Sequence, residues 1–237
     1  MAVTSKGPRI SVNDLALFMV SSDTARMGII RRAKFPQKSV VIRYRDARPP
    51  LVAHLTDPIR SVNPLATAEQ MLAQRAIDPS QSSLAQDDAK QSIEVLHAIQ
   101  GMANKLKGYD FQSVPLKQAK LKLGGVEVSV YADMLVHGST KGHEQIGAAI
   151  LRMTQDDADT DPAKAKRKEM GLYVATMARL HVDQNISSNR QPTNKLCMSI
   201  DVQHGEVFCA PDSNTRRMKD LENACRTIAA LWPTIEK

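Results

Sequence analysis

The sequence predicts a mixed α/β protein of the α+β kind, in which helices are combined with antiparallel strands. Three observations predict it. Residues 84–106 place apolar side chains at helical spacing and are followed by a glycine. Residues 126–130 alternate apolar and polar side chains directly after the Gly-Gly pair at 124–125, which favours a hairpin turn. Pro162 is placed to open a further helix, because proline is favoured in the first helical turn.

The second half of the chain is expected to contain a helix, a three-strand β-meander, a helix, a β-hairpin and a helix. The helices cover residues 84–106, 162–182 and 213–231, the meander strands 116–123, 126–136 and 146–153, and the hairpin strands 196–202 and 206–210. We expect residues 84–237 to form one α/β core, since a chain of 237 residues suits one large domain.

The first half is expected to form a helical and extended basic region, residues 1–83, packed on that core. It contains a predicted helix at 11–32, a short strand at 40–44, and a second helix at 65–77. Residues 46–64 hold four prolines and are expected to be an extended connection.

Composition limits the functional classes. The net charge is +7, which favours anionic partners such as nucleic acid. Three cysteines without a CxxC pair indicate free thiols and a cytoplasmic location. No apolar run is long enough to span a membrane, so we expect no membrane partner. Neither a phosphate-binding glycine loop nor a serine-hydrolase elbow occurs.

The order of elements, with Ala132-Asp133 on the second meander strand, resembles the PD-(D/E)XK nuclease superfamily, especially its RecB-like and Cas4-like members. In that restriction-endonuclease-like core, an Asp on the second strand binds metal and the third strand carries an acid and a lysine. The resemblance covers roughly residues 84–237. It implies that Asp133 holds Mg²⁺ or Mn²⁺, since hard cations take carboxylate oxygens.

The third strand departs from the family pattern. Ala148 and Ile150 stand where the second acid and the lysine belong, and neither can bind metal or polarise water. Glu144 is the acid that would replace them, so Asp133 and Glu144 are the candidate catalytic residues. His97 corresponds to a further metal ligand of some family members, although the apolar face of its helix equally predicts a core or boundary histidine. The alternative for Asp133 is exposure at a strand end, or pairing with a lysine.

Candidate nucleic-acid contacts come from three places in the chain. Glu169 and Tyr173 correspond to a Q-x-x-x-Y pair of RecB-like members, and their spacing places both on one helix face. The structural alternative is that Tyr173 packs on the sheet while Glu169 pairs with a lysine. Residues 26–48 hold eight cations, a density that suits phosphate contacts as well as a solvated surface. The full candidate set is Arg26, Arg31, Arg32, Lys34, Arg152, Glu169 and Tyr173.

These patterns favour a nuclease-like DNA-binding module, catalytically degenerate, that acts in DNA processing or defence. Two alternatives stay open. One is an active Mg²⁺-dependent DNA nuclease with a rearranged site, and the other is a protein-interaction subunit of a larger complex. Whether the protein is an enzyme is left open by the missing acid and lysine.

Overall fold

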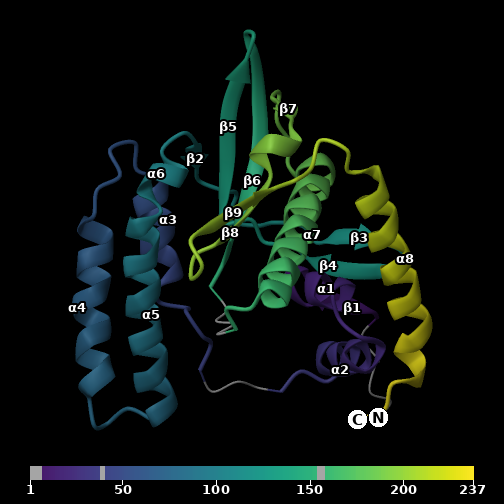
Figure 1. Cartoon of the computed structure of the whole chain (residues 1–237), viewed down its shortest axis with the longest axis horizontal. Coiled ribbons are helices and arrows are strands. Elements are labelled where there is room, and N and C mark those ends of the chain that lie inside the picture. Colours follow the sequence, from purple (N-terminus) through teal and green to yellow (C-terminus); the bar gives the residue numbers. More distant parts are fainter. Residues whose placement is uncertain (1–6, 38–40, 154–157) are drawn as a thin grey trace.

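The computed structural model describes residues 7–37, 41–153 and 158–237, and its centre is a large mixed sheet (Figure 1). The strands run in the order β2-β5-β6-β8-β9, and β7 pairs with β6 outside this path. Their bounds are Asp110–Gln112 for β2, Met134–Thr140 for β5, His143–Arg152 for β6, Gln191–Pro192 for β7, Met198–Asp201 for β8 and Glu206–Cys209 for β9.

Strand β6 is the axis of this sheet. It is antiparallel to β5 and parallel to β8, and helix α7 (Asp161–Asn185) makes the crossover between the two parallel strands. Both faces of β6 are buried, with Ala148 and Ile150 in one hydrophobic core and Ala149 and Leu151 in the other. A strand covered on both faces needs a continuous apolar run, which explains the sequence of β6.

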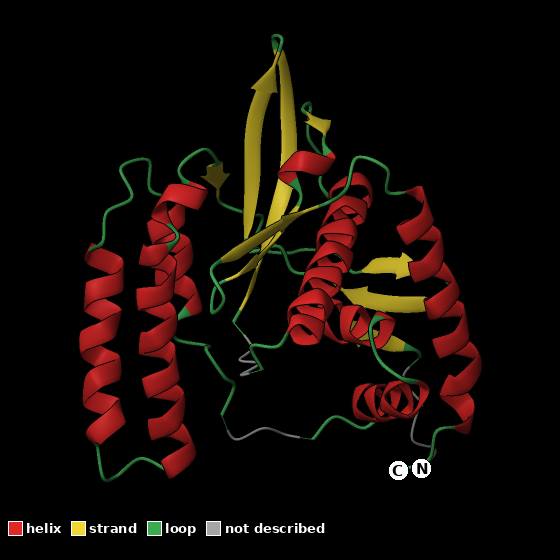
Figure 2. Ribbon diagram, in the orientation of Figure 1, coloured by secondary structure: helices red, strands yellow, loops and turns green. Residues whose placement is uncertain are grey.

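Helices cover both faces of the sheet (Figure 2). One layer is formed by α3 to α6, which lie on the left in Figure 1, and the other by α7 with α1, α2 and α8. The bounds are Val12–Met19 for α1, Asp23–Lys34 for α2, Arg48–Thr56 for α3, Asn63–Ile77 for α4, Ser83–Gly101 for α5, Ala103–Leu106 for α6 and Thr215–Leu231 for α8. Short 3₁₀ turns lie at Asn194–Leu196 and Trp232–Thr234.

The predicted three-strand meander is wrong in its first two strands. The hairpin of β3 (Leu121–Leu123) and β4 (Val126–Ser129) belongs to a second, small sheet, in which β1 (Arg9–Ser11) runs parallel to β4. Between β4 and β5 the chain crosses from one sheet to the other. The antiparallel meander of the structure is therefore β2-β5-β6.

The side chain of Gln118 stabilises the segment that crosses between the two sheets. Its side-chain amide accepts a hydrogen bond from the Ala132 N–H and donates one to the Ala132 carbonyl oxygen, both at 2.9 Å. These bonds satisfy backbone groups that a continuous strand over residues 126–136 would have paired with a neighbour. The alternation of apolar and polar residues cannot reveal that a side chain takes the place of a strand partner here.

The hairpin turn at 124–125 is confirmed, with φ of +52° at Gly124 and +83° at Gly125. A side chain on Gly124 would also place its Cβ atom 2.6 Å from the Glu222 carbonyl oxygen of α8. Glycine is required there by both backbone conformation and close packing.

Three predictions for the N-terminal region are wrong. The predicted helix at 11–32 is two helices, α1 and α2, separated at residues 20–22. The predicted extended connection at 46–64 contains α3, because Pro49 and Pro50 occupy its first turn, where no N–H donor is needed. The described part of the predicted strand at 40–44 is not a strand, and Val40 lies outside the described residues.

Tyr44 explains why no strand forms before α3. Its φ is +58°, and its N–H donates a hydrogen bond of 2.9 Å to Asp88 Oδ1 on α5. Its hydroxyl contacts Gln91 Oε1 and accepts a hydrogen bond from Gln203 Nε2, both at 3.1 Å. These tertiary contacts outweigh the β propensity of the segment.

The remaining elements agree with the sequence prediction. Helices were expected at 65–77, 84–106, 162–182 and 213–231, and α4, α5 with α6, α7 and α8 occupy these segments; the hairpin expected at 196–210 is β8 and β9. The three cysteines are free thiols. Within the described residues, no helix is both long and apolar enough to cross a membrane.

Candidate functional site

Asp133 lies immediately before β5, beside the end of β6, and its side chain is only 7% exposed. Arg48 Nη1 from the first turn of α3 donates to Asp133 Oδ1, and the Leu151 N–H donates to Oδ2 at 2.7 Å. The second arm of the guanidinium, Nη2, donates to the Leu151 carbonyl oxygen at 3.3 Å. Both carboxylate oxygens of Asp133 are thus engaged by donors of the protein itself.

The electrostatics of this pair are set by burial. Burial raises the pKa of Asp133, while the Arg48 guanidinium and the Leu151 N–H act in the opposite direction. Arg48 is the more accessible partner, because its side chain is 41% exposed. The donor set fits a carboxylate neutralised by arginine. Ala148 and Ile150, the β6 positions where the family pattern has an acid and a lysine, are apolar residues of one hydrophobic core.

A cavity of about 340 Å³ opens beside Arg48, and we call it the Arg48 cavity. Its lining carries two arginines and no carboxylate, and consists of Asn13, Arg43, Tyr44, Arg48, Gln91, Leu151 and Met153. Arg43 is also paired with Asp87 at 2.7 Å on the rim. The Asn13 Oδ1 atom is buried and has no hydrogen-bond partner among the described residues. Such a lining is suited to an anionic group.

Glu144 does not join Asp133. In the register of β5 and β6, Met134 pairs with Ala149, whereas Glu144 pairs with Ser139, five residues further along the strands. Five residues of strand span about 17 Å. The Glu144 carboxylate is instead exposed and paired with Arg190 at 3.0 Å. The two candidate catalytic acids therefore cannot share one metal ion in this conformation.

His97 does not face Asp133 either. It is an exposed residue of α5, and its Nε2 atom lies 2.9 Å from Glu69 Oε1 on α4. The alternative of a core or boundary histidine is wrong as well, because its side chain is 57% exposed. Across the described residues, no group of three or more His, Cys, Asp or Glu side chains is placed to hold a metal ion.

Arg152 is buried at the end of β6, between Asp201 and Met170, and cannot reach a phosphate from there. Its Nη1 atom lies 3.6 Å from Asp201 Oδ2, and its Nη2 atom lies 3.7 Å from Met170 Sδ. Burial lowers the pKa of Arg152, and the Asp201 charge opposes this effect. Asp201 also contacts the Nδ1 atom of His204 at 2.9 Å, so it orients neighbours inside the protein.

Glu169 and Tyr173 share a face of α7, as their spacing predicts. Arg217 of α8 bridges them, because its guanidinium pairs with Glu169 at 2.9 and 3.2 Å and lies 4.8 Å from the Tyr173 ring centre. Tyr173 packs against the core, as the structural alternative predicted, but the partner of Glu169 is an arginine and not a lysine.

The N-terminal cations do not form one free surface. Arg26 donates to the Phe18 and Met19 carbonyl oxygens and pairs with Asp23, while Lys34 donates to the Trp232 and Ile235 carbonyl oxygens at 2.6 and 2.8 Å. Of the four candidate cations in this region, Arg31 and Arg32 are exposed on α2.

Sequence reasoning missed the residues that line the Arg48 cavity. The available signal was the close spacing of Arg43, Arg45 and Arg48 before the two prolines, which was included only in a general basic segment. The pairing of Arg48 with Asp133 bridges 85 positions of the sequence and leaves no local pattern.

The fold and site thus define a mixed α/β protein in which a buried aspartate, Asp133, is paired with Arg48 beside the central strands β5 and β6. No protein-family model matches the chain, and no curated protein matches it either.

Proposed function

We propose that this protein is a nuclease-like nucleic-acid-binding module that does not cut its ligand. The observation that carries the proposal is the Asp133–Arg48 ion pair beside a cavity lined by arginines and by no carboxylate. In this proposal, the cavity receives a backbone phosphate where a cutting enzyme of the same family would hold its metal ion.

The topology supports the nuclease-like part of the proposal. Helix α5 precedes the antiparallel meander β2-β5-β6, and α7 then leads to β8, parallel to β6. This is the order expected from the resemblance, with the β3–β4 hairpin inserted between the first two meander strands. Asp133 lies beside the buried end of β6, next to Leu151.

The lack of cutting follows from the chemistry around Asp133. Metal-assisted hydrolysis needs an open coordination sphere on the ion and a nearby group that handles the water proton. Here both Asp133 oxygens accept hydrogen bonds, and the two β6 residues whose backbone Asp133 contacts, Ala149 and Leu151, have buried apolar side chains. Arginine stays charged at any ordinary pH, so Arg48 cannot serve as the base.

Helix α8 supports an anionic partner independently. Its first turn holds Arg216 and Arg217 and no acid, although cations are unfavourable at a helix N-terminus. Arg216 is exposed, and Arg217 covers the Glu169–Tyr173 face of α7. A phosphate at this end would be favoured by both the arginines and the helix dipole.

The test is DNA binding and cleavage by the full chain, with Mn²⁺ or Mg²⁺ present. We expect no cleavage, and salt-sensitive binding in which Arg43→Gln lowers the salt slope by about one phosphate contact. Lys195→Gln, an exposed cation outside the candidate nucleic-acid contacts, is the matched control. Cleavage that disappears in Asp133→Asn would overturn the proposal in favour of an active, rearranged nuclease. Absence of any binding would also overturn it.

One observation favours a protein partner as the second candidate. The exposed residues of α4 are all uncharged: Asn63, Ala66, Thr67, Gln70, Met71, Ala73, Gln74 and Ile77. The two charged residues of this helix, Glu69 and Arg75, are turned to partners on other segments, His97 and Asp46. Depletion of charge is typical of the centre of a protein interface. Light scattering of the parent and of Met71→Lys tests this candidate, since a self-association through α4 would be lost in the variant.

A further inference from the structure

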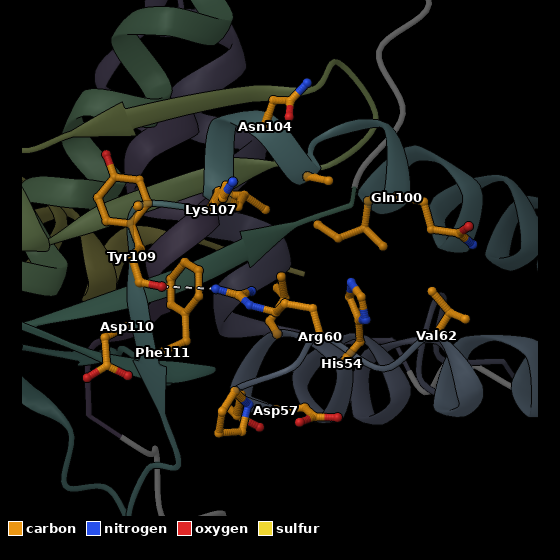
Figure 3. Close-up of a pocket in the computed structure, with 17 residues that line it drawn as sticks. His54, Asp57, Arg60, Val62, Gln100, Asn104, Lys107, Tyr109, Asp110 and Phe111 are labelled. Atoms are coloured by element: carbon orange, nitrogen blue, oxygen red, sulfur yellow. Dashed lines mark hydrogen bonds between the residues drawn. The ribbon is translucent and has the colours of Figure 1, made fainter.

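A second cavity, of about 900 Å³, is separate from the Arg48 cavity (Figure 3). It lies between the α3–α4 connection, the end of α5 with α6, and strand β2. Volumes of 300 to 1,000 Å³ are typical of sites for small organic ligands. Figure 3 shows His54 and Arg60 on one side of the space, and Gln100, Asn104 and Lys107 on the other.

Arg60 is the unusual residue of this cavity. Its Nη2 atom donates to the Tyr109 carbonyl oxygen at 2.9 Å, and its guanidinium lies 5.1 Å from the centre of the Phe111 ring. The residue has a φ of +52°, in the left-handed region that residues other than glycine seldom adopt. Asp57 precedes Arg60 by three positions, yet its carboxylate accepts backbone N–H groups of Ile59 and Ser61.

Among the described residues Arg60 forms no salt bridge, although the charges of the Asp110 and Asp57 carboxylates, which also line the cavity, act on it from farther away. The surroundings also desolvate it, and burial lowers the pKa of Arg60. A partly desolvated arginine with four of its five N–H donors unused by the described protein is prepared to bind an anion.

His54 supplies an acceptor on the same side. Its Nδ1 atom lies 2.8 Å from the Ser61 carbonyl oxygen, which can only accept, so Nδ1 carries the proton. In the neutral form of the ring, the Nε2 atom is therefore an acceptor. Because His54 is only 8% exposed and lines the cavity, that acceptor is available to a ligand held inside.

The rest of the lining contains the Asp57 and Asp110 carboxylates on one side, together with apolar and amide side chains. Leu55, Ile99 and Leu106 form apolar wall, while Gln100 and Asn104 offer amide groups. The cavity therefore combines a cation against an aromatic ring, an apolar wall and neutral hydrogen-bonding groups. This combination suits a flat heterocycle that carries an anionic group, because the anion can contact the arginine while the ring lies against the apolar wall and the amides contact its polar edge.

We propose that this cavity binds a nucleotide, with the phosphate at Arg60 and Lys107 and the base between the apolar wall and the amides of Gln100 and Asn104. The proposal is independent of the nucleic-acid function given above, because it rests on different residues. The nucleotide can come from two sources, a free mononucleotide or the unpaired end of a strand, and both share the chemistry named here.

The experiment is isothermal titration of the full chain with AMP, GMP, CMP and UMP, with adenosine and inorganic phosphate as partial probes. We expect one or more mononucleotides to bind, with adenosine at least about tenfold weaker than AMP if AMP binds. Arg60→Gln is expected to weaken binding about tenfold, because a charge-assisted hydrogen bond is lost. Lys90→Gln, an exposed cation of α5 outside the cavity, is the matched control.

A second variant, Gln100→Leu, keeps the result interpretable if Arg60→Gln folds poorly, since it alters the base-facing wall alone. Saturation by no mononucleotide at millimolar concentration would overturn the proposal, as would equal affinity in the parent, Arg60→Gln and Gln100→Leu. A short single strand that competes with the mononucleotide identifies the strand end as the source, and its failure to compete identifies the free nucleotide. Loss of DNA binding in Arg43→Gln with nucleotide binding unchanged separates this site from the one proposed above.

Discussion

Arg48 and Arg60 flank the same short helix, α3, and differ in what surrounds their charge. Arg48 opens the helix and is neutralised by the buried carboxylate of Asp133. Arg60 follows the helix, lies against Phe111 and bonds a carbonyl oxygen. Arg48 is paired with a buried carboxylate beside two strands, whereas the Arg60 guanidinium lines a cavity. The comparison separates an arginine that stabilises the fold from one whose position is better explained by a ligand.

The largest expected effect tests the closed site. Replacement Asp133→Ala leaves the Leu151 N–H buried and Arg48 without its partner. We expect the free energy of unfolding to fall by roughly 3 kcal/mol, the low end of the range for breaking a buried pair, because Arg48 is partly exposed. Urea denaturation measures it, with the exposed Asp110→Ala as control. Equal stability of the two variants would show that the pair does not stabilise the fold.

Arg48→Met tests the same pair from its other side. It leaves a buried carboxylate whose pKa is already raised by burial, and it removes the charge that opposes this rise. A raised pKa in the folded state means that stability is lost as pH increases through that pKa. We expect a deficit of about 2 kcal/mol relative to the parent at pH 8, and a smaller one near pH 5. Urea denaturation at both pH values checks it, and a deficit independent of pH would contradict it.

Arg60→Gln sharpens the contrast between the two arginines. This variant lacks one hydrogen bond to the Tyr109 carbonyl oxygen and one contact with Phe111, but it loses no ion pair. We expect stability to change by less than about 1 kcal/mol, while nucleotide binding weakens. Thermal unfolding without ligand makes the comparison. A loss as large as that of Asp133→Ala would reclassify Arg60 as a structural residue.

The smallest effect is expected at His97. Its contact with Glu69 is exposed at both partners, and exposed pairs contribute little. We expect His97→Ala to change the free energy of unfolding by no more than about 0.5 kcal/mol and to leave any metal response unaltered. Calorimetry with and without Mn²⁺ provides the measurement. A Mn²⁺-dependent stabilisation lost in this variant would restore His97 as a metal ligand.

Local sequence pattern predicted much of the fold. The α5, α7 and α8 segments and the two hairpins follow from periodicity and turn residues. The exchange of strands between the two sheets does not, because it depends on the Gln118 amide contacting Ala132. Helix α3 was missed because its two prolines were interpreted as breakers, whereas they stand in its first turn.

The candidate site was predicted in part. Asp133 is a buried carboxylate beside β6 that pairs with a cation. The sequence alternative predicted such a pairing, but with a lysine. The partner Arg48 comes from a segment predicted to be extended, and no local signal connects the two. The second cavity was missed for the same reason, since Arg60, Gln100 and Tyr109 meet only after the helical layer packs on β2.

The pairing of β1 with β4 has a consequence for folding during synthesis. Arg9 pairs with Glu127, so β1 has no β4 partner during synthesis until the long segment between the two strands has been made. The α4–α5 helical hairpin, in contrast, is closed by a short turn and needs only its own residues. Local contacts form faster than distant ones. The N-terminal strand is therefore a site where a chaperone, or the strand edge of another chain, competes with the native partner.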